Sequence, residues 1–317
     1  MFSRRFLRIK IIKALYAYHK SESDKLDLAE KNLMSSIDKS YDLYLKMLSL
    51  MPLVAKYAEE RIEIAKNKKL PTYEDLNPNC KFINNRVIAQ LAASHDLEVL
   101  VENKGLGWVK NPEIIKHLYN KLINSEYYQA YMLNSPGEKE SYKKDLHLVQ
   151  DFYINTVQDD ELMEALLEEE SIQWADDLDY ALIMVVRTLS DMRAKDTDIE
   201  LLRKYKNEED KEFVQKLFRS AILNYNAHLN YIEQYTKNWD VERIAFMDNL
   251  IMVAAMAELI EFDSIPVKVT FDEYIEIAKH YSTAGSGTFI NGILDKVANS
   301  LTKEGKITKS GRGLIGA

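Results

Sequence analysis

The chain has 317 residues, of which 46% are hydrophobic and 29% charged, and its formal net charge is −8. This length suits one large or two ordinary domains, and the acidic balance argues against a protein that coats nucleic acid with its whole surface. The single cysteine, Cys80, excludes an internal disulfide and fits a reducing cytoplasm, and no apolar run reaches the roughly 18 residues that a membrane span needs.

The charge is unevenly distributed along the chain. Residues 1–20 carry six Lys or Arg and no acid, whereas residues 159–179 carry ten acids and no base. Such a layout permits one local anion-binding surface on an acidic body.

The first predicted helix covers about residues 3–19, because Leu7, Ile11 and Leu15 recur at a spacing of four residues. The basic residues of its first turns lie in an adjoining sector of the same helix. A second helix begins near residue 24, and Pro52 marks a kink or a join before the apolar pattern continues to residue 64.

The middle of the chain alternates loops and helices. Residues 67–85, with two prolines and several asparagines, read as a loop. Further helices are expected at about residues 87–102, 113–122, 138–156, 180–192, 208–236, 241–260, 272–281 and 286–299. No segment shows strand alternation, so the predicted fold class is all-α.

Motifs for catalysis or cofactor binding are missing. The glycines around Ser286 are too few for a phosphate loop and no strand precedes them, so Ser286 is interpreted as a helix N-cap. Glu276 and His280 are four residues apart and could hold a metal, but a solvated helix face explains them better. We therefore expect no enzyme activity, no metal and no cofactor.

The basic N-terminal helix is the strongest functional signal. Arg4, Arg5, Arg8 and Lys13 could contact phosphates, and Tyr16 could stack on a splayed base. Taken alone, such a cluster is equally well explained as a solvated face.

Two blocks of the sequence resemble the NusB family of transcription antitermination factors. The C-terminal block, residues 238–297, carries the hallmarks Trp239, Arg243, Glu258-Leu259, Ile265-Pro266, Lys268-Val269, Glu273, Ala278-Lys279, Phe289-Ile290-Asn291-Gly292 and Leu294-Asp295. The N-terminal block, Arg4-Arg5-Phe6-Leu7-Arg8 followed by Ala14-Leu15-Tyr16, is similar to the family's arginine-rich start.

The resemblance implies a fold of two packed helical bundles and a role in binding the boxA element of nascent ribosomal RNA. It also implies two partners, the ribosomal protein that serves as NusE and an antitermination complex with RNA polymerase. RNA contacts would fall on Arg4, Arg5, Arg8, Lys13, Tyr16, Ser286 and Phe289.

The resemblance also suggests a domain layout. The family core would comprise residues 1–50 and 206–301, with a helical insertion at residues 51–205. A basic tail, residues 302–317, lacks apolar periodicity and is expected to be mobile.

Two other functions compete with RNA binding. Three positions depart from the family pattern: Thr288 is usually basic, Gly285 is often acidic and Val253 is commonly Arg. These departures favour a protein-interaction scaffold of NusB type with weak or lost RNA binding. An RNA cytosine methyltransferase with a NusB-like domain would need a dinucleotide-type domain and a catalytic cysteine, and the lone Cys80 and helical middle argue against it.

Overall fold

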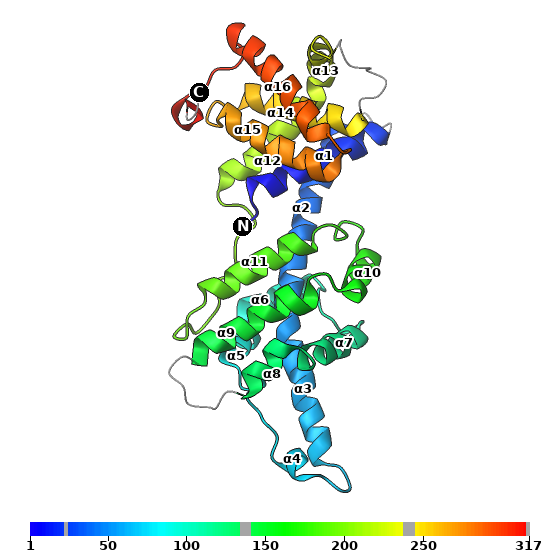
Figure 1. Cartoon of the computed structure of the whole chain (residues 1–317), viewed down its shortest axis with the longest axis vertical. Coiled ribbons are helices and arrows are strands. Elements are labelled where there is room, and N and C mark those ends of the chain that lie inside the picture. Colours follow the sequence, from blue (N-terminus) through cyan, green and yellow to red (C-terminus); the bar gives the residue numbers. More distant parts are fainter. Residues whose placement is uncertain (22–24, 134–140, 237–244, 315–317) are drawn as a thin grey trace. The chain divides into compact units, whose positions relative to one another are not determined.

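The computed structural model describes residues 1–21, 25–133, 141–236 and 245–314. Helices dominate and no strand forms among these residues, which confirms the predicted all-α fold (Figure 1). Within the same ranges, no helix is long and apolar enough to cross a membrane.

The chain divides into two compact units. We call residues 2–37 and 205–317 the split unit, and residue 1 with residues 38–204 the middle unit. Helix α2 (Leu26–Leu48) contributes to both units, because the division falls between Ile37 and Asp38. The sequence-based boundary after residue 50 would place all of α2 in the family core, and that layout stays a prediction.

The split unit is built around one buried helix. Besides α2 it contains α1 (Arg4–Lys20), α12 (Glu208–Leu223), α13 (Tyr225–Glu233), α14 (Phe246–Glu261), α15 (Val267–Tyr281) and α16 (Ser286–Lys303). Every residue of α14 from Leu250 to Leu259 is buried, as expected for a helix that is apolar on all sides. Helices α1, α12, α13, α15 and α16 all pack against α14.

The apolar stripe of α1 provides its contact with α12 and α14. Leu7, Ile11 and Leu15 are completely buried, as their spacing predicts. Burial of such a side chain stabilises the fold by roughly 1.5–3 kcal/mol relative to leaving it exposed. Packing therefore fixes the rotation of α1 and with it the direction of its basic side chains.

Several helix boundaries predicted from the sequence were wrong; for example, the helix expected at residues 272–281 already begins at Val267. The expected helix at residues 208–236 is broken at Asn224, whose side-chain amide donates to the carbonyl oxygen of Ser220 and ends α12. Ser286 is the first residue of α16 and not its N-cap, because Gly285 takes the capping position with a left-handed φ of 92°. A residue without Cβ adopts this φ without strain.

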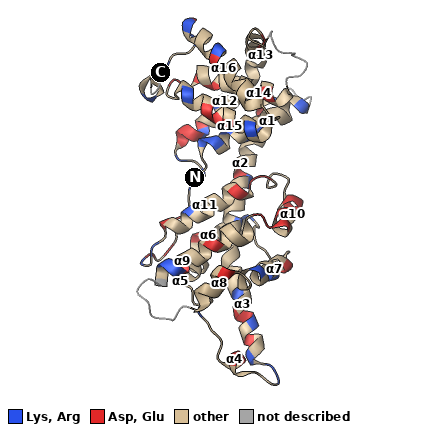
Figure 2. Cartoon of the chain, in the orientation of Figure 1, with Lys and Arg blue, Asp and Glu red and all other residues tan. Residues whose placement is uncertain are grey.

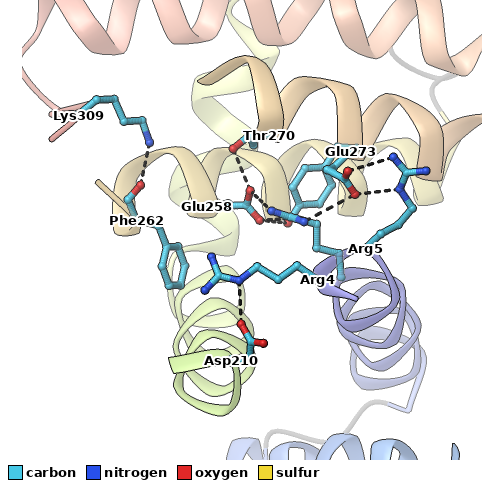
Figure 3. A network of polar contacts seen from close by, with 10 residues as sticks. Arg4, Arg5, Asp210, Glu258, Phe262, Thr270, Glu273 and Lys309 are labelled. Carbon is cyan, nitrogen blue, oxygen red and sulfur yellow. Dashed lines mark hydrogen bonds and ion pairs between the residues drawn. The ribbon is translucent and has the colours of Figure 1, made fainter. Parts of the chain in front are cut away.

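The structure describes the C-terminal tail up to Leu314, and the expected mobility of the tail stays a prediction. The Lys309 ammonium donates to the carbonyl oxygens of Leu259 and Phe262, both at 2.9 Å, where a cation suits the end of α14 (Figure 3). A 3-10 turn, η3 (Gly311–Leu314), follows. A Cβ on Gly313 would lie 1.9 Å from the Asp263 carbonyl oxygen, so only glycine fits there.

The middle unit has a separate helical core. Besides part of α2 it contains the elements from α3 to α11. These are α3 (Leu50–Lys66), α4 (Tyr73–Leu76), α5 (Arg86–Ala93), α6 (His95–Asn103), α7 (Pro112–Ile123), α8 (Glu126–Leu133), α9 (Ser141–Phe152), a π-helical turn η1 (Tyr153–Val157), α10 (Glu161–Glu170) and α11 (Leu178–Asp191). Helix α3 packs against α5 and α7, and α9 packs against α5, α8 and α11. Pro52 lies in the first turn of α3, which confirms the predicted join.

Acidic residues gather on α10 of the middle unit (Figure 2). Met163, Leu166 and Leu167 form its buried side, while its glutamates are exposed. Most of the acidic run seen in the sequence is thus the solvated face of an amphipathic helix and its flanking turns, whereas Asp160 and Asp177 are buried.

Candidate functional site on helix α1

The Ser3 hydroxyl begins helix α1 by accepting a hydrogen bond from the Phe6 amide at 3.2 Å. This cap sets the first turns, so that Arg4 and Arg8 are four residues apart on one face and Arg5 lies beside them. All three guanidinium groups meet carboxylates from other helices of the split unit (Figure 3).

Arg8 forms a buried, two-point ion pair with Glu258 of α14. Its Nε and Nη2 donate to the two carboxylate oxygens at 2.7 and 2.8 Å, and the side chains are 2% and 0% exposed. Glu258 also accepts hydrogen bonds from the hydroxyls of Thr270 and Tyr274, at 2.8 and 3.2 Å. A buried carboxylate satisfied from three sides is a structural brace.

The local pKa values agree with a permanently charged pair. Burial alone would lower the pKa of Arg8, but the charge and hydrogen bonds of Glu258 raise it above its ordinary value. Burial, and then the adjacent charge of Glu258, raises the pKa of Tyr274 well above its usual range, so its hydroxyl keeps the proton that it donates. Arg8 and Tyr274 therefore both keep their protons near neutral pH.

Arg4 and Arg5 form ion pairs nearer the surface. Arg4 Nε lies 2.9 Å from Asp210 of α12, and Arg5 donates through Nε and Nη2 to both oxygens of Glu273 of α15, at 2.9 and 3.0 Å. The two arginine side chains are 36% and 46% exposed. Each can therefore still meet an anion from solvent, although each already holds one.

Arg8, which was predicted to contact RNA, exposes almost none of its side chain to solvent. Its guanidinium is buried and committed to Glu258, and Nη1 lies 3.7 Å from Glu273 as well. Releasing it would leave a charge buried without its partner, which is far more costly than the gain from one phosphate contact.

A second group of predicted residues lies further along α1. Lys13 Nζ is 5.3 Å from the centre of the Tyr281 ring. Arg5 meets Glu273 and Lys13 meets Tyr281, so the two contacts are eight residues apart on both helices. Helices α1 and α15 therefore run side by side in the same direction, and the Lys13 end is roughly 12 Å from the Arg5 end at ~1.5 Å per residue.

Tyr16 belongs to an aromatic and basic surface cluster, which we call the aromatic end of α1. Its side chain is 40% exposed, and its ring centre is 5.7 Å from that of Phe246. Lys20 Nζ lies 4.7 Å from the centre of the Phe246 ring and 5.8 Å from that of Tyr16. Aromatic faces flanked by ammonium groups are the usual means of holding unstacked bases and their phosphates.

The junction of α15 and α16 lies near the same end. The Ser286 hydroxyl donates to Asp248 of α14 at 3.0 Å, and Ser286 is 3% exposed. The predicted direct contact with RNA would require this buried hydroxyl to leave Asp248. Phe289, in the first turn of α16, is partly exposed and remains a candidate.

Sequence reasoning missed two residues of this surface. Phe246 and Tyr281 join it only because α1, α14 and α15 pack together. A signal for the brace was available: Glu258 is an acid within the almost wholly apolar segment of α14, and a buried acid requires a cation.

Comparisons with known proteins agree with this fold. Residues 180–299 match the model of the NusB family, which includes α12 to α16 but not α1. The chain is 42% identical over 106 residues to the "Transcription antitermination protein NusB" of Salinibacter ruber, and 42% identical over 105 residues to that of Chloroherpeton thalassium. Each match covers 33% of this chain, and they cover 66% and 50% of those relatives.

Two further proteins are similar to parts of the chain. The corresponding protein of Natranaerobius thermophilus is 44% identical over 73 residues, which is 23% of this chain and 52% of the relative. The chain thus spans only half to about two thirds of these curated relatives. A solved structure of NusB from T. maritima is 29% identical and covers 45% of this chain and 89% of its own, with a TM-score of 0.29.

The family match falls in the C-terminal part of the chain, where α14 and α15 supply the acids that hold Arg8 and Arg5 of α1. This chain carries a NusB-family domain, and the residues outside that match are additional, consistent with an insertion.

Proposed function

We propose that the chain is an RNA-binding transcription antitermination factor of the cytoplasm that acts without catalysis or cofactor. It takes a single-stranded, boxA-like site in nascent ribosomal RNA, together with the ribosomal protein NusE, within an antitermination complex that contains RNA polymerase. The family match and the printed name of the relatives support the antitermination role. The exposed aromatic end of α1 is the observation that carries RNA binding.

The proposed interface follows α1 from Arg5 to Lys20. Tyr16 and Phe289 would stack on bases, because every base offers a π-face. Lys13 and Lys20 would neutralise phosphates, with Arg4 and Arg5 extending the charge toward the start of the helix. An unstacked single strand suits such a surface better than a duplex does.

The test is fluorescence anisotropy with a labelled single-stranded boxA-like RNA, the same RNA as a duplex, and the DNA of the same sequence. Tyr16→Ala should weaken binding by about 1–3 kcal/mol, the usual value of one stacked base. Tyr73→Ala is the matched control, because Tyr73 is 77% exposed but lies on α4 of the middle unit. Equal affinity for Tyr16→Ala and the unsubstituted protein would count against this interface.

A scaffold with weak or lost RNA binding is the second candidate. It is favoured by the acids that occupy Arg4, Arg5 and Arg8, since a guanidinium paired in this way attracts phosphate less strongly. Under this alternative, the full chain binds none of the three nucleic acids at low salt, where phosphate contacts are strongest.

A further inference from the structure

The Arg5–Glu273 pair has the geometry of a ligand complex. Arginine and a carboxylate meet through two parallel hydrogen bonds, at 2.9 and 3.0 Å. A phosphate would use the same two donors in the same arrangement. Glu273 therefore occupies the position on Arg5 that an RNA phosphate would take.

The buried Arg8 helps to hold Glu273 in this position. The Glu273 side chain is 19% exposed, and its Oε2 lies 3.7 Å from Nη1 of Arg8. Arg8 is itself fixed by Glu258, so the carboxylate is oriented between one buried and one surface guanidinium. Even when a phosphate displaces Glu273 from Arg5, the carboxylate stays close enough to repel that phosphate.

We propose that Glu273 is a built-in competitor for the RNA phosphate at Arg5 and thereby limits the RNA affinity of the chain. This inference rests on the proposed function. The pair is exposed on the Arg5 side, and such pairs contribute little to stability, so a phosphate can displace the carboxylate. Removing the negative charge while keeping the shape should reduce the competition with the RNA phosphate for Arg5.

The neighbouring Glu276 provides a matched control. It is exposed, lies one turn further along α15, and forms an ion pair with Lys279. Its carboxylate also interacts electrostatically with Arg5. Glu276→Gln thus removes the same charge from the same helix but leaves the two-point contact between Arg5 and Glu273 intact.

The experiment compares the full chain with Glu273→Gln, Glu276→Gln, Arg5→Ala and the double variant Arg5→Ala/Glu273→Gln. Affinity for a short single-stranded boxA-like RNA is measured over a series of NaCl concentrations. Glu273→Gln should tighten binding about three- to tenfold at low salt and steepen the slope of log K against log salt by about 0.7, the value of one added phosphate contact. In the Arg5→Ala background the same substitution should have no more effect than Glu276→Gln. Thermal unfolding of each variant confirms that the fold is retained.

The outcomes separate the two proposals. Equal tightening by Glu273→Gln and Glu276→Gln, with RNA still bound, would show a diffuse charge effect and overturn the inference alone. Binding by Glu273→Gln but not by the unsubstituted chain would support the inference in its strongest form. Absence of binding by every variant at low salt would overturn the proposed function and the inference with it.

Discussion

The two ends of helix α1 use basic residues in opposite ways. At the arginine end, Arg4, Arg5 and Arg8 are held by acids from three other helices, and the innermost pair is buried. At the aromatic end, Lys13 and Lys20 lie over aromatic rings at the surface. The comparison shows that clustered positive charge in a sequence has two structural outcomes, and that burial of the partner decides between them.

The largest effect should come from removing the buried brace. Arg8→Ala leaves Glu258 charged and without its main partner inside the core, so the free energy of unfolding should fall by about 3–5 kcal/mol. Urea unfolding followed by circular dichroism measures this change. Arg5→Ala is the surface control and should cost no more than about 1 kcal/mol. Similar losses of unfolding free energy in the two variants would show that the buried and the surface ion pair do not differ as described.

A substitution at the aromatic end of α1 should lower RNA affinity more than it lowers stability. Phe246→Leu keeps an apolar side chain against His19 and Tyr16 but removes the ring face. We expect a loss of about 1 kcal/mol in RNA affinity, the lower limit for one stacked base, and a smaller change in unfolding free energy. Anisotropy titration and urea unfolding of the same preparation check both values. A loss of stability with unchanged RNA affinity would assign Phe246 to packing alone.

Much of α1 could be predicted from the sequence alone. The four-residue spacing of Leu7, Ile11 and Leu15 fixed which face is buried, because periodicity is a local property. The fate of the arginines was not predictable in this way. Arg8 and Glu258 are 250 positions apart, and only the packing of α1 on α14 brings them together. A charge cluster read locally cannot show which members face acids from elsewhere.

Helix ends and the tail were predictable only in part. Pro52 marked the join between α2 and α3 because proline restricts the backbone wherever it lies. The break at Asn224 and the docking of Lys309 depend on particular hydrogen bonds to backbone carbonyls. Lys309 finds its acceptors at the end of α14, about 50 positions earlier in the chain. A tail without apolar periodicity can therefore still be anchored by a single cation.

A finer test of the comparison uses salt. Lys20→Ala at the aromatic end should reduce the slope of log K against log salt by about 0.7, the loss of one phosphate contact with a single strand. Lys69→Ala is the matched control, since Lys69 is exposed on the middle unit beyond the end of α3. Anisotropy at several NaCl concentrations gives both slopes. A reduced slope for Lys69→Ala and not for Lys20→Ala would place the phosphate contacts outside the split unit.

The smallest expected effect is a pH dependence of stability that distinguishes the two ends of helix α1. Burial lowers the pKa of His19, whose ring lies 4.1 Å from that of Tyr225 and whose buried Nε2 has no hydrogen-bond partner among the described residues. The folded chain therefore binds the His19 proton more weakly than the unfolded chain does. The stability that depends on neutral His19 is fully present above the unfolded pKa of about 6.5. It is lost as the pH falls below that value, because the unfolded state takes up the proton first. Arg8 should not contribute to this change, since its pKa is raised. We expect urea unfolding midpoints to fall as the pH is lowered from 7.5 to 5.5. His19→Gln should reduce that fall, whereas His280→Gln at the exposed end of α15 should not.

An unchanged pH dependence in His19→Gln would assign the acid sensitivity to another group. The buried His228 of α13 is the first to examine, because burial also lowers its pKa.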